Sequence, residues 1–269
     1  MENILLLNST FSLSHTLHSG QFFNYLYDEK DESYIIVDGK KIFKVKQVEK
    51  ILYYEHINEE SLKAFLGLNF NINTIKHFED EYFQQAFLAC EGIRVMKCDV
   101  FQTIISFICS AAANISKIKN NVKLISQNFG EYSSEFNTYC FPAPEKINDL
   151  ELLKKCRVGY RAKYILEVSQ YFAKHPFALK ELEDMNYYDA MGFLQTLLGI
   201  GSKIANCICL FALNHYEAFP VDTWIEKILK EEYKFVGNNK QLEFLAKEYF
   251  KEYAGYYQQY LFHYSRTKK

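Results

Sequence analysis

The sequence predicts an α+β fold, with an N-terminal antiparallel β-sheet domain over residues 1–82 followed by a mainly helical body over residues 83–269. Two observations predict this division. Before residue 82, β-branched and aromatic runs alternate with turn residues. From about residue 83, apolar residues recur at the i, i+3, i+4 and i+7 positions of a helix. A content of 49% hydrophobic and 24% charged residues is that of a globular protein with a buried core.

The sheet is expected first along the chain. The run "SYIIVDGKKIFKVKQVEKILYYEH" is interrupted by Asp38-Gly39, a strong hairpin turn signal. The stretch "LHSGQFFNYLYD" predicts another short strand, entered through Ser19-Gly20. Together these runs predict a small antiparallel sheet.

Helices are expected next, with few interruptions. Apolar residues at helical spacing run through 81–93, 99–130, 161–172 and 241–265, and "CFPAPEKIND" is the clearest loop. Only four prolines occur in the chain, which permits long helices.

Charge and cysteine content limit the classes of function. The formal net charge is −2 and the isoelectric point is about 6.4, so global charge does not suggest a nucleic-acid binder. Bases do gather near Lys117 and near Arg161, either as solvated helix faces or as a local anion-binding surface. The seven cysteines are odd in number and several lie in apolar runs, as in a reduced intracellular protein. No Cys-x2-Cys pair occurs, so no structural zinc site is expected from the spacing.

The N-terminus has no signal-peptide pattern, and no apolar run approaches the roughly 18 residues of a membrane span. We therefore expect an intracellular protein, cytoplasmic or nucleoid-associated, without a membrane partner.

A helix-hairpin-helix is predicted at about 187–214. Asn186 can cap a first helix, Gly199-Ile200-Gly201 forms a tight turn in which each glycine can take positive φ, and Ser202 can cap the second helix. The unpaired amides of such a turn form an anion site of the phosphate-binding kind. The alternative is a purely structural turn.

Lys203 and Asp222 carry the chemistry that the sequence suggests. The positive end of the helix dipole disfavours the protonated amine of Lys203, and an unprotonated lysine is a nucleophile that forms Schiff bases. Cys207 lies one turn further on the same face. Asp222 follows Pro220-Val221 at a position suited to a helix cap, which is its structural alternative.

The stretches "LLGIGSKIANCICLFAL" and "FPVDTW" resemble the helix-hairpin-helix DNA glycosylase superfamily, and within it the 8-oxoguanine DNA glycosylases. "SGQFFNY", "TIISFICSAAANISKI", "GYRAKY" and "YAGYYQQYLF" match further family segments in the family's order. The resemblance implies a sheet domain followed by helical parts, the same architecture that the residue pattern predicts.

The resemblance implies a bifunctional base-excision repair enzyme, both a DNA glycosylase and an AP lyase, acting on double-stranded DNA that contains 8-oxoguanine. Lys203 would form the Schiff base and Asp222 would stabilise the cationic transition state. The alternative is a catalytically silent lesion-binding module, which would be expected to have lost Lys203 or Asp222. A monomer is expected.

The resemblance also implies roles for residues around the two catalytic ones. Base binding would fall to Gly20, Cys207, Gln258 and Phe262. The residues expected to contact DNA are Gly199, Gly201, Ser202, Tyr160, Arg161, Asn114, Lys117 and Trp224. Trp224 stands where eukaryotic members have a phosphate-contacting histidine, so its contact would depend on the indole N–H.

The resemblance requires no cofactor. A monovalent or divalent cation on the hairpin would be held by backbone carbonyls of Gln195, Leu197 and Ile200. No iron–sulfur cluster is expected, because related glycosylases that carry one bind it with cysteines near the C-terminal end and this chain has none after Cys209.

Overall fold

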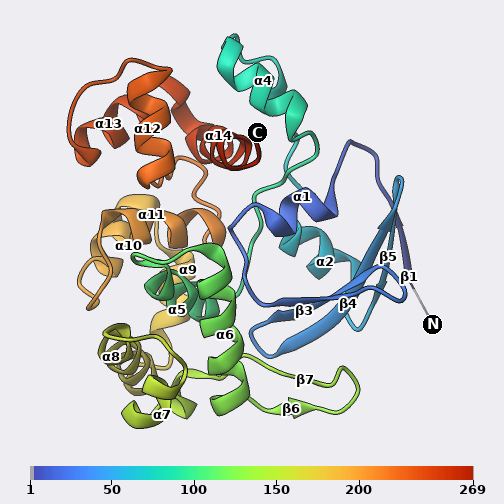
Figure 1. Ribbon diagram of the computed structural model, residues 1–269, viewed down its shortest axis with the longest axis vertical. Coiled ribbons are helices and arrows are strands. Elements are labelled where there is room, and N and C mark those ends of the chain that lie inside the picture. Colours follow the sequence, from blue (N-terminus) through green and yellow to red (C-terminus); the bar gives the residue numbers. More distant parts are fainter. Residues whose placement is uncertain (1–2, 269) are drawn as a thin grey trace.

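The computed structural model describes residues 3–268 and begins with a five-stranded antiparallel sheet of order β1-β5-β4-β3-β2 (Figure 1). The strands are β1 (Asn3–Leu6), β2 (Tyr25–Asp28), β3 (Ser33–Asp38), β4 (Lys41–Val48) and β5 (Ile51–Glu55). Asp38 pairs with Lys41 across the β3–β4 turn, and Gly39 has φ +60° there. The predicted hairpin at Asp38-Gly39 is confirmed.

Helices make up most of the chain after the sheet. They are α2 (Glu59–Phe65), α3 (Asn73–Lys76), α4 (Glu81–Ala89), α5 (Val100–Ser110), α6 (Ile115–Phe129), α7 (Leu150–Lys155), α8 (Arg161–Lys174), α9 (Ala178–Asp184), α10 (Tyr187–Leu194), α11 (Ser202–Phe211), α12 (Thr223–Glu231), α13 (Asn239–Phe250) and α14 (Ala254–Thr267). A two-stranded ribbon, β6 (Tyr132–Ser133) and β7 (Thr138–Tyr139), precedes the predicted loop. The α+β prediction is confirmed.

The segment 99–130 is two helices, because α5 ends at Ser110 and Asn114 caps α6 by accepting from the Lys117 amide at 2.9 Å. Ala112, in the connection, has φ +47°, a left-handed conformation that no helix continues through. This break exposes the short connection 111–114 beside α11, where it becomes part of a cavity wall.

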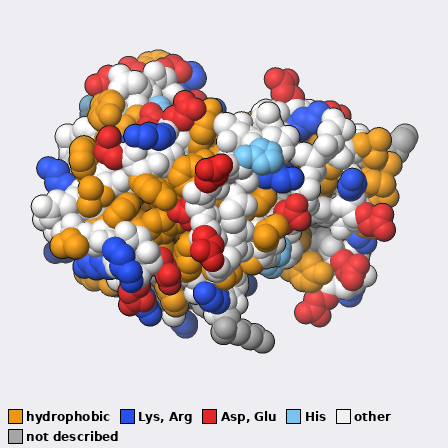
Figure 2. Space-filling view, turned by 90° about the horizontal axis from the view of Figure 1, so that it is seen from above, with side chains coloured by type: hydrophobic (Ala, Val, Ile, Leu, Met, Phe, Trp, Pro, Cys, Tyr) orange, Lys and Arg blue, Asp and Glu red, His pale blue; other side chains and the backbone are white. Residues whose placement is uncertain are grey.

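Two apolar cores hold the molecule together. One lies between the sheet and helices α1 (Leu13–His18) and α2, with Phe43 and Leu62 at its centre, and the larger one joins helices from α4 to α14. Apolar side chains also reach the surface, and Figure 2 shows them gathered on the left half of the upper face among interspersed acids and bases. No helix within residues 3–268 is long and apolar enough to cross a membrane.

The short strand predicted to follow Ser19-Gly20 is present as β2, and the residues before that turn form a helix that the sequence did not predict. Leu13–His18 forms α1, with Ser12 capping the His15 amide at 3.2 Å and with Leu13 and Leu17 buried at i, i+4 spacing. A six-residue helix is too short for the periodicity to reveal. Gly20, with φ +82°, turns the chain toward β2, which begins only at Tyr25.

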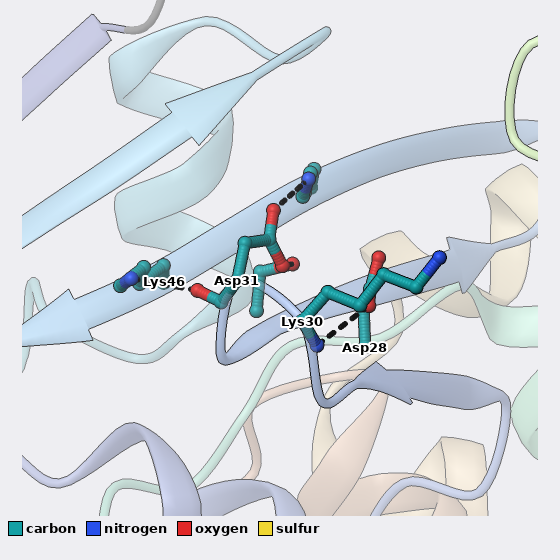
Figure 3. A network of polar contacts seen from close by, with 6 residues as sticks. Asp28, Lys30, Asp31 and Lys46 are labelled. Carbon is teal, nitrogen blue, oxygen red and sulfur yellow. Dashed lines mark hydrogen bonds and ion pairs between the residues drawn. The ribbon is translucent and has the colours of Figure 1, made fainter.

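The β2–β3 turn is fixed by a small polar network (Figure 3). The Asp31 carboxylate pairs with Lys44 and accepts from the Ser33 hydroxyl, and Lys46 donates to the Asp31 carbonyl at 2.6 Å. The Lys30 amide donates to Asp28 at 3.0 Å. The network is half-buried, with Ser33 buried and Lys30 exposed, and it joins the turn to β4, so it orients this edge of the sheet.

Candidate active site

The predicted helix-hairpin-helix is present as α10 and α11. Asn186 caps α10 by accepting from the Asp189 amide at 3.1 Å, as expected. Gly199 has φ +84°, and a Cβ there would lie 2.5 Å from the Tyr164 ring, so only glycine fits. Gly201 has φ −92°, which corrects the prediction that both glycines use positive φ.

Ser202 does not cap α11, contrary to the prediction. The cap position belongs to Gly201, no side chain accepts from the first amides, and the Ser202 hydroxyl donates to Glu243 at 2.8 Å. Nothing lies within 4 Å of a Cβ placed on Gly201. The first turn of α11 therefore presents uncapped amides on an open surface, the arrangement that binds a phosphate.

Elements far apart in the sequence form one cavity of about 690 Å³ beside this hairpin. Lys203 on α11 and Asp222 before α12 both line it, together with Gly20 and Phe262. Other residues of its wall are Phe107, Ser110, Asn114, Ile115, Gly201, Trp224 and Arg266. The structure thus brings together both predicted catalytic residues and two of the four predicted base-binding residues.

Lys203 reaches the cavity as a half-buried amine. Its Nζ donates to the Ser110 hydroxyl at 3.2 Å and lies 5.5 Å from the centre of the Phe107 ring. Within residues 3–268 it forms no salt bridge. The amine at the cavity is thus held by a hydroxyl and not by a carboxylate, and a lysine amine is a group that can act as a nucleophile.

Asp222 is the cap of α12 and a cavity residue at once. Its Oδ1 accepts from the amides of Trp224 at 3.1 Å and Ile225 at 2.9 Å. Its Oδ2 makes no hydrogen bond with the described part of the chain. Burial raises the pKa of this carboxyl, against the opposing effects of the capping amides, Lys203 and Arg266. The two sequence interpretations are therefore compatible, because one oxygen can cap while the other faces a substrate.

Gly20 and Phe262 lie close to each other in the cavity wall. A Cβ on Gly20 would lie 2.9 Å from Ile115 Cδ1 and 3.0 Å from the Phe262 ring. With φ +82° as well, this position accepts only glycine. The close approach leaves the Gly20 backbone at the cavity surface next to an aromatic face.

Cys207 and Gln258 lie in the core and do not line the cavity as it stands. Burial raises the pKa of the Cys207 thiol to about 11, so this cysteine is a neutral, apolar contact. Gln258 donates to the Pro220 carbonyl at 3.3 Å, but its Oε1 is buried without a hydrogen-bond partner among the described residues.

The predicted DNA-contacting residues divide into exposed and buried ones. Asn114 and Trp224 line the cavity, Tyr160 is 59% exposed, and Lys117 is exposed. Arg161 is only 3% exposed: its guanidinium donates to the carbonyls of Val158, at 3.1 Å, and of Ala111. It stacks on Tyr160 at 4.5 Å, so in this structure it points into the protein.

Of the three hairpin carbonyls predicted to hold a cation, two lack a backbone hydrogen-bond donor among the described residues. Leu197 O accepts from the Ile200 amide at 3.2 Å, which leaves it a second lone pair. Within residues 3–268, the carbonyls of Gln195 and Ile200 accept no backbone hydrogen bond in the hairpin. Carbonyl oxygens without a donor are ligands that hard cations take.

Sequence reasoning missed Arg266. Its guanidinium lies 5.1 Å from the Phe262 ring, lines the cavity, and has a buried Nη1 without a hydrogen-bond partner among the described residues. Burial lowers its pKa and the charge of Asp222 opposes that effect. The one available signal was its position four residues after Phe262, on the same face of a helix.

Comparisons with known proteins show the family to which this chain belongs. The model of the "8-oxoguanine DNA glycosylase, N-terminal domain" family matches residues 3–104. A probable N-glycosylase/DNA lyase of Methanothermobacter thermautotrophicus is 30% identical, with 77% of this chain and 74% of the relative covered. The chain belongs to the 8-oxoguanine DNA glycosylase family.

Two further members of this family resemble the chain over nearly its whole length. The N-glycosylase/DNA lyase of Saccharomyces cerevisiae is 28% identical over 90% of this chain and 73% of its own. The 8-oxoguanine glycosylase/lyase of Clostridium acetobutylicum, solved with double-stranded DNA containing cytosine opposite 8-oxoguanine, superposes with a TM-score of 0.88 at 27% identity, covering 98% of this chain and 97% of its own. The family resemblance seen in the sequence motifs is confirmed.

Proposed function

We propose that this protein excises 8-oxoguanine from double-stranded DNA and then cleaves the strand at the abasic site. Membership of the 8-oxoguanine DNA glycosylase family supports the reaction class. The observation that carries the proposal is the shared cavity, which is lined by Lys203, an amine without a salt bridge among residues 3–268, by the carboxylate Asp222, and by Gly20 and Phe262.

Base recognition would use the Gly20 backbone. Guanine N7 is a hydrogen-bond acceptor, whereas 8-oxoguanine carries N7–H, a donor, so a carbonyl directed at N7 accepts from the lesion and repels guanine. Phe262 would stack on one face of the base. The unsatisfied Oε1 of Gln258 is an acceptor that a donor on the Watson–Crick edge would satisfy. For Gln258 and Cys207 to contact the base, the cavity wall must open further than it does here.

Bond breaking would follow from Lys203 and Asp222. The Nζ lone pair forms a bond to C1′ while the glycosidic bond breaks and its electron pair leaves with the base. The sugar becomes cationic in the transition state, and the free Oδ2 of Asp222 stabilises that charge. The Lys203 nitrogen then loses a proton, and the C1′–O4′ bond breaks with protonation of O4′, which opens the sugar ring and leaves a protonated imine at C1′. This imine makes the 2′ proton acidic, and loss of that proton expels the 3′ phosphate by β-elimination.

The hairpin would hold the DNA backbone while the base is extruded, which costs a few kcal/mol. The uncapped amides of α11 bind a phosphate, and a cation on the carbonyls of Gln195, Leu197 and Ile200 adds positive charge there. Exposed Tyr160 fills the space that the base leaves. Arg161 would read the partner base only after its guanidinium leaves the Val158 and Ala111 carbonyls.

The proposed binding partner of the protein is duplex DNA that contains the lesion. The protein would bind it as a monomer, inside the cell. The alternative of a silent lesion-binding module has no support from the site, because Lys203 and Asp222 are both placed in the cavity.

Single-turnover incubation with a duplex that carries one 8-oxoguanine tests the proposal. We expect a free base and, without added alkali, a strand with an unsaturated sugar at its 3′ end. The same duplex with guanine is the control. Intact strands after alkali treatment would refute the proposal.

A further inference from the structure

Helices α1, α4 and α14 are labelled in Figure 1. Three side chains of the types that ligate metals, one from each of these segments, meet outside the base cavity. They are His15 of α1, Cys90 at the end of α4, and His263 of α14. One ligand atom from each lies within 4.8 Å of the other two. Cys90 and His263 are buried and His15 is half-buried, so the cluster reaches solvent only at His15.

Both imidazoles have a buried nitrogen without a partner. Within residues 3–268, neither His15 Nδ1 nor His263 Nδ1 makes a hydrogen bond. A buried polar atom left unsatisfied costs about 1–3 kcal/mol. Two such atoms in adjacent rings, whose centres are 5.4 Å apart, indicate that a ligand completes the cluster.

The backbones that carry the cluster are held in place without a metal. The Ser12 amide donates to the Gly92 carbonyl at 2.9 Å, which ties the start of α1 to the end of α4. Gln259 donates to the Ser19 carbonyl at 2.9 Å, and the Tyr260 hydroxyl donates to the Ile93 carbonyl at 3.0 Å. These bonds tie α14 to both segments, so the three ligands are preorganised.

We propose that His15, Cys90 and His263 bind one Zn²⁺, with a water in the fourth position. Zinc takes thiolate at about 2.3 Å and imidazole at about 2.0–2.1 Å in a tetrahedron, which sets the ligand atoms roughly 3.3–3.6 Å apart. Because the three ligand atoms lie within 4.8 Å of one another, each pair needs to close by about 1.5 Å at most. A thiolate with two imidazoles selects zinc over the hard cations magnesium and calcium.

Zinc binding by this cluster exchanges a proton for the metal. Each imidazole gives the lone pair of a ring nitrogen, and His15 Nδ1 and His263 Nδ1 are buried without a partner among the described residues. The Cys90 thiol gives up its proton: the S–H bond breaks, an S–Zn bond forms, and the proton passes to solvent.

The site lies next to the proposed base-binding residues without belonging to them. His263 follows Phe262, and His15 precedes Gly20 by little more than one helical turn. A bound metal would fix α1 to α14 and so hold the wall that Gly20 and Phe262 form. The sequence analysis expected no structural zinc because the chain has no Cys-x2-Cys pair. The three proposed ligands are far apart in the sequence, so the absence of that pair does not bear on this site.

Metal binding by untagged, metal-stripped full-length protein tests the inference apart from any activity. We expect one Zn²⁺ per chain by elemental analysis after dialysis. Co²⁺ as a probe should give a thiolate-to-metal charge-transfer band. Cys90→Ser should abolish the band, and His15→Asn should weaken Zn²⁺ binding by more than about tenfold, since loss of even an outer-shell partner typically costs 10–100-fold.

Matched controls are Cys156→Ser, at an equally buried cysteine that ends α7, and His18→Asn, on the same helix as His15. Both should keep the band and the stoichiometry. The inference is overturned if wild-type protein binds no zinc, or if the band persists in Cys90→Ser. The inference is also overturned if His15→Asn binds Zn²⁺ as tightly as wild type does. His15 is only half-buried, so we expect this variant to fold.

Discussion

At the scale of single residues, Asp222 offers the sharpest separation of a structural from a chemical role. Asp222→Asn keeps an oxygen to accept from the Trp224 and Ile225 amides, and asparagine caps helices as well as aspartate does. We expect unchanged thermal stability and a base-excision rate about 100-fold lower or more, because the change removes a charge that the transition state needs. Single-turnover rates and melting curves check this. A nearly normal rate would leave Asp222 as a cap alone.

Arg266 should influence the pH dependence of the same carboxyl. Burial raises the pKa of Asp222, and the charge of Arg266 is one of the effects that lower it. Arg266→Met removes that charge, so the Asp222 pKa should rise and the acid limb of the excision profile should move to higher pH. Lys227→Met, on an exposed lysine of α12, is the control. An acid limb that stays in place would show that Arg266 does not act on Asp222.

Residue types with a fixed backbone or chemical requirement could be predicted from the sequence. Gly20, Gly199, Lys203 and Asp222 stand where the motifs placed them, because turns, caps and reactive side chains leave local signals. The burial of Arg161 and the position of Arg266 left none, since both depend on which carbonyls and rings the fold brings near them. The His15, Cys90 and His263 cluster is invisible in sequence for the same reason.

At the scale of elements, the two hairpin glycines should separate folding from DNA binding. Gly199→Ala combines φ +84° with a contact of 2.5 Å to Tyr164, so we expect a loss of about 1–3 kcal/mol of stability. Gly201→Ala meets nothing within 4 Å at φ −92°, so it should fold normally and weaken DNA binding by obstructing the approach of a phosphate. Denaturation and duplex-affinity measurements on both variants test this. Equal destabilisation would contradict the assignment of separate roles.

The sequence predicted the boundary of an element correctly where residues with strong positional preferences mark that boundary. The β3–β4 hairpin and the α10 cap were predictable because Asp38-Gly39 and Asn186 have strong positional preferences. The α1 helix and the break after α5 were not, because six residues carry little periodicity and Ala112 carries no turn signal. Ser202 was taken for a cap because serine is a common one, but Glu243 of a later helix binds its hydroxyl.

At the scale of the whole molecule, we expect the protein to bind DNA through local phosphate contacts in spite of its negative net charge. The chain carries a formal charge of −2, and acids and bases intermix on the face in Figure 2. Phosphate contacts at the hairpin and at Lys117 are local, so duplex affinity should still fall linearly with salt on a logarithmic scale, with a slope near −0.9 per phosphate contact. Titrations from low to moderate salt measure the slope. A flat affinity would mean that the proposed DNA surface is wrong.

The arrangement of the whole molecule, a sheet domain and a helical body meeting around one cavity, is what gives Lys203 its role in this account. Lys119 is the informative competitor, because it is also half-buried and burial lowers its pKa, while its amine lies over the Tyr25 ring at 3.9 Å. Borohydride reduction during reaction with an 8-oxoguanine duplex converts the imine of the reacting lysine to a permanent crosslink. The account predicts that wild type and Lys119→Gln form the crosslinked complex and that Lys203→Gln forms none while still binding the duplex. Full crosslinking by Lys203→Gln would contradict it.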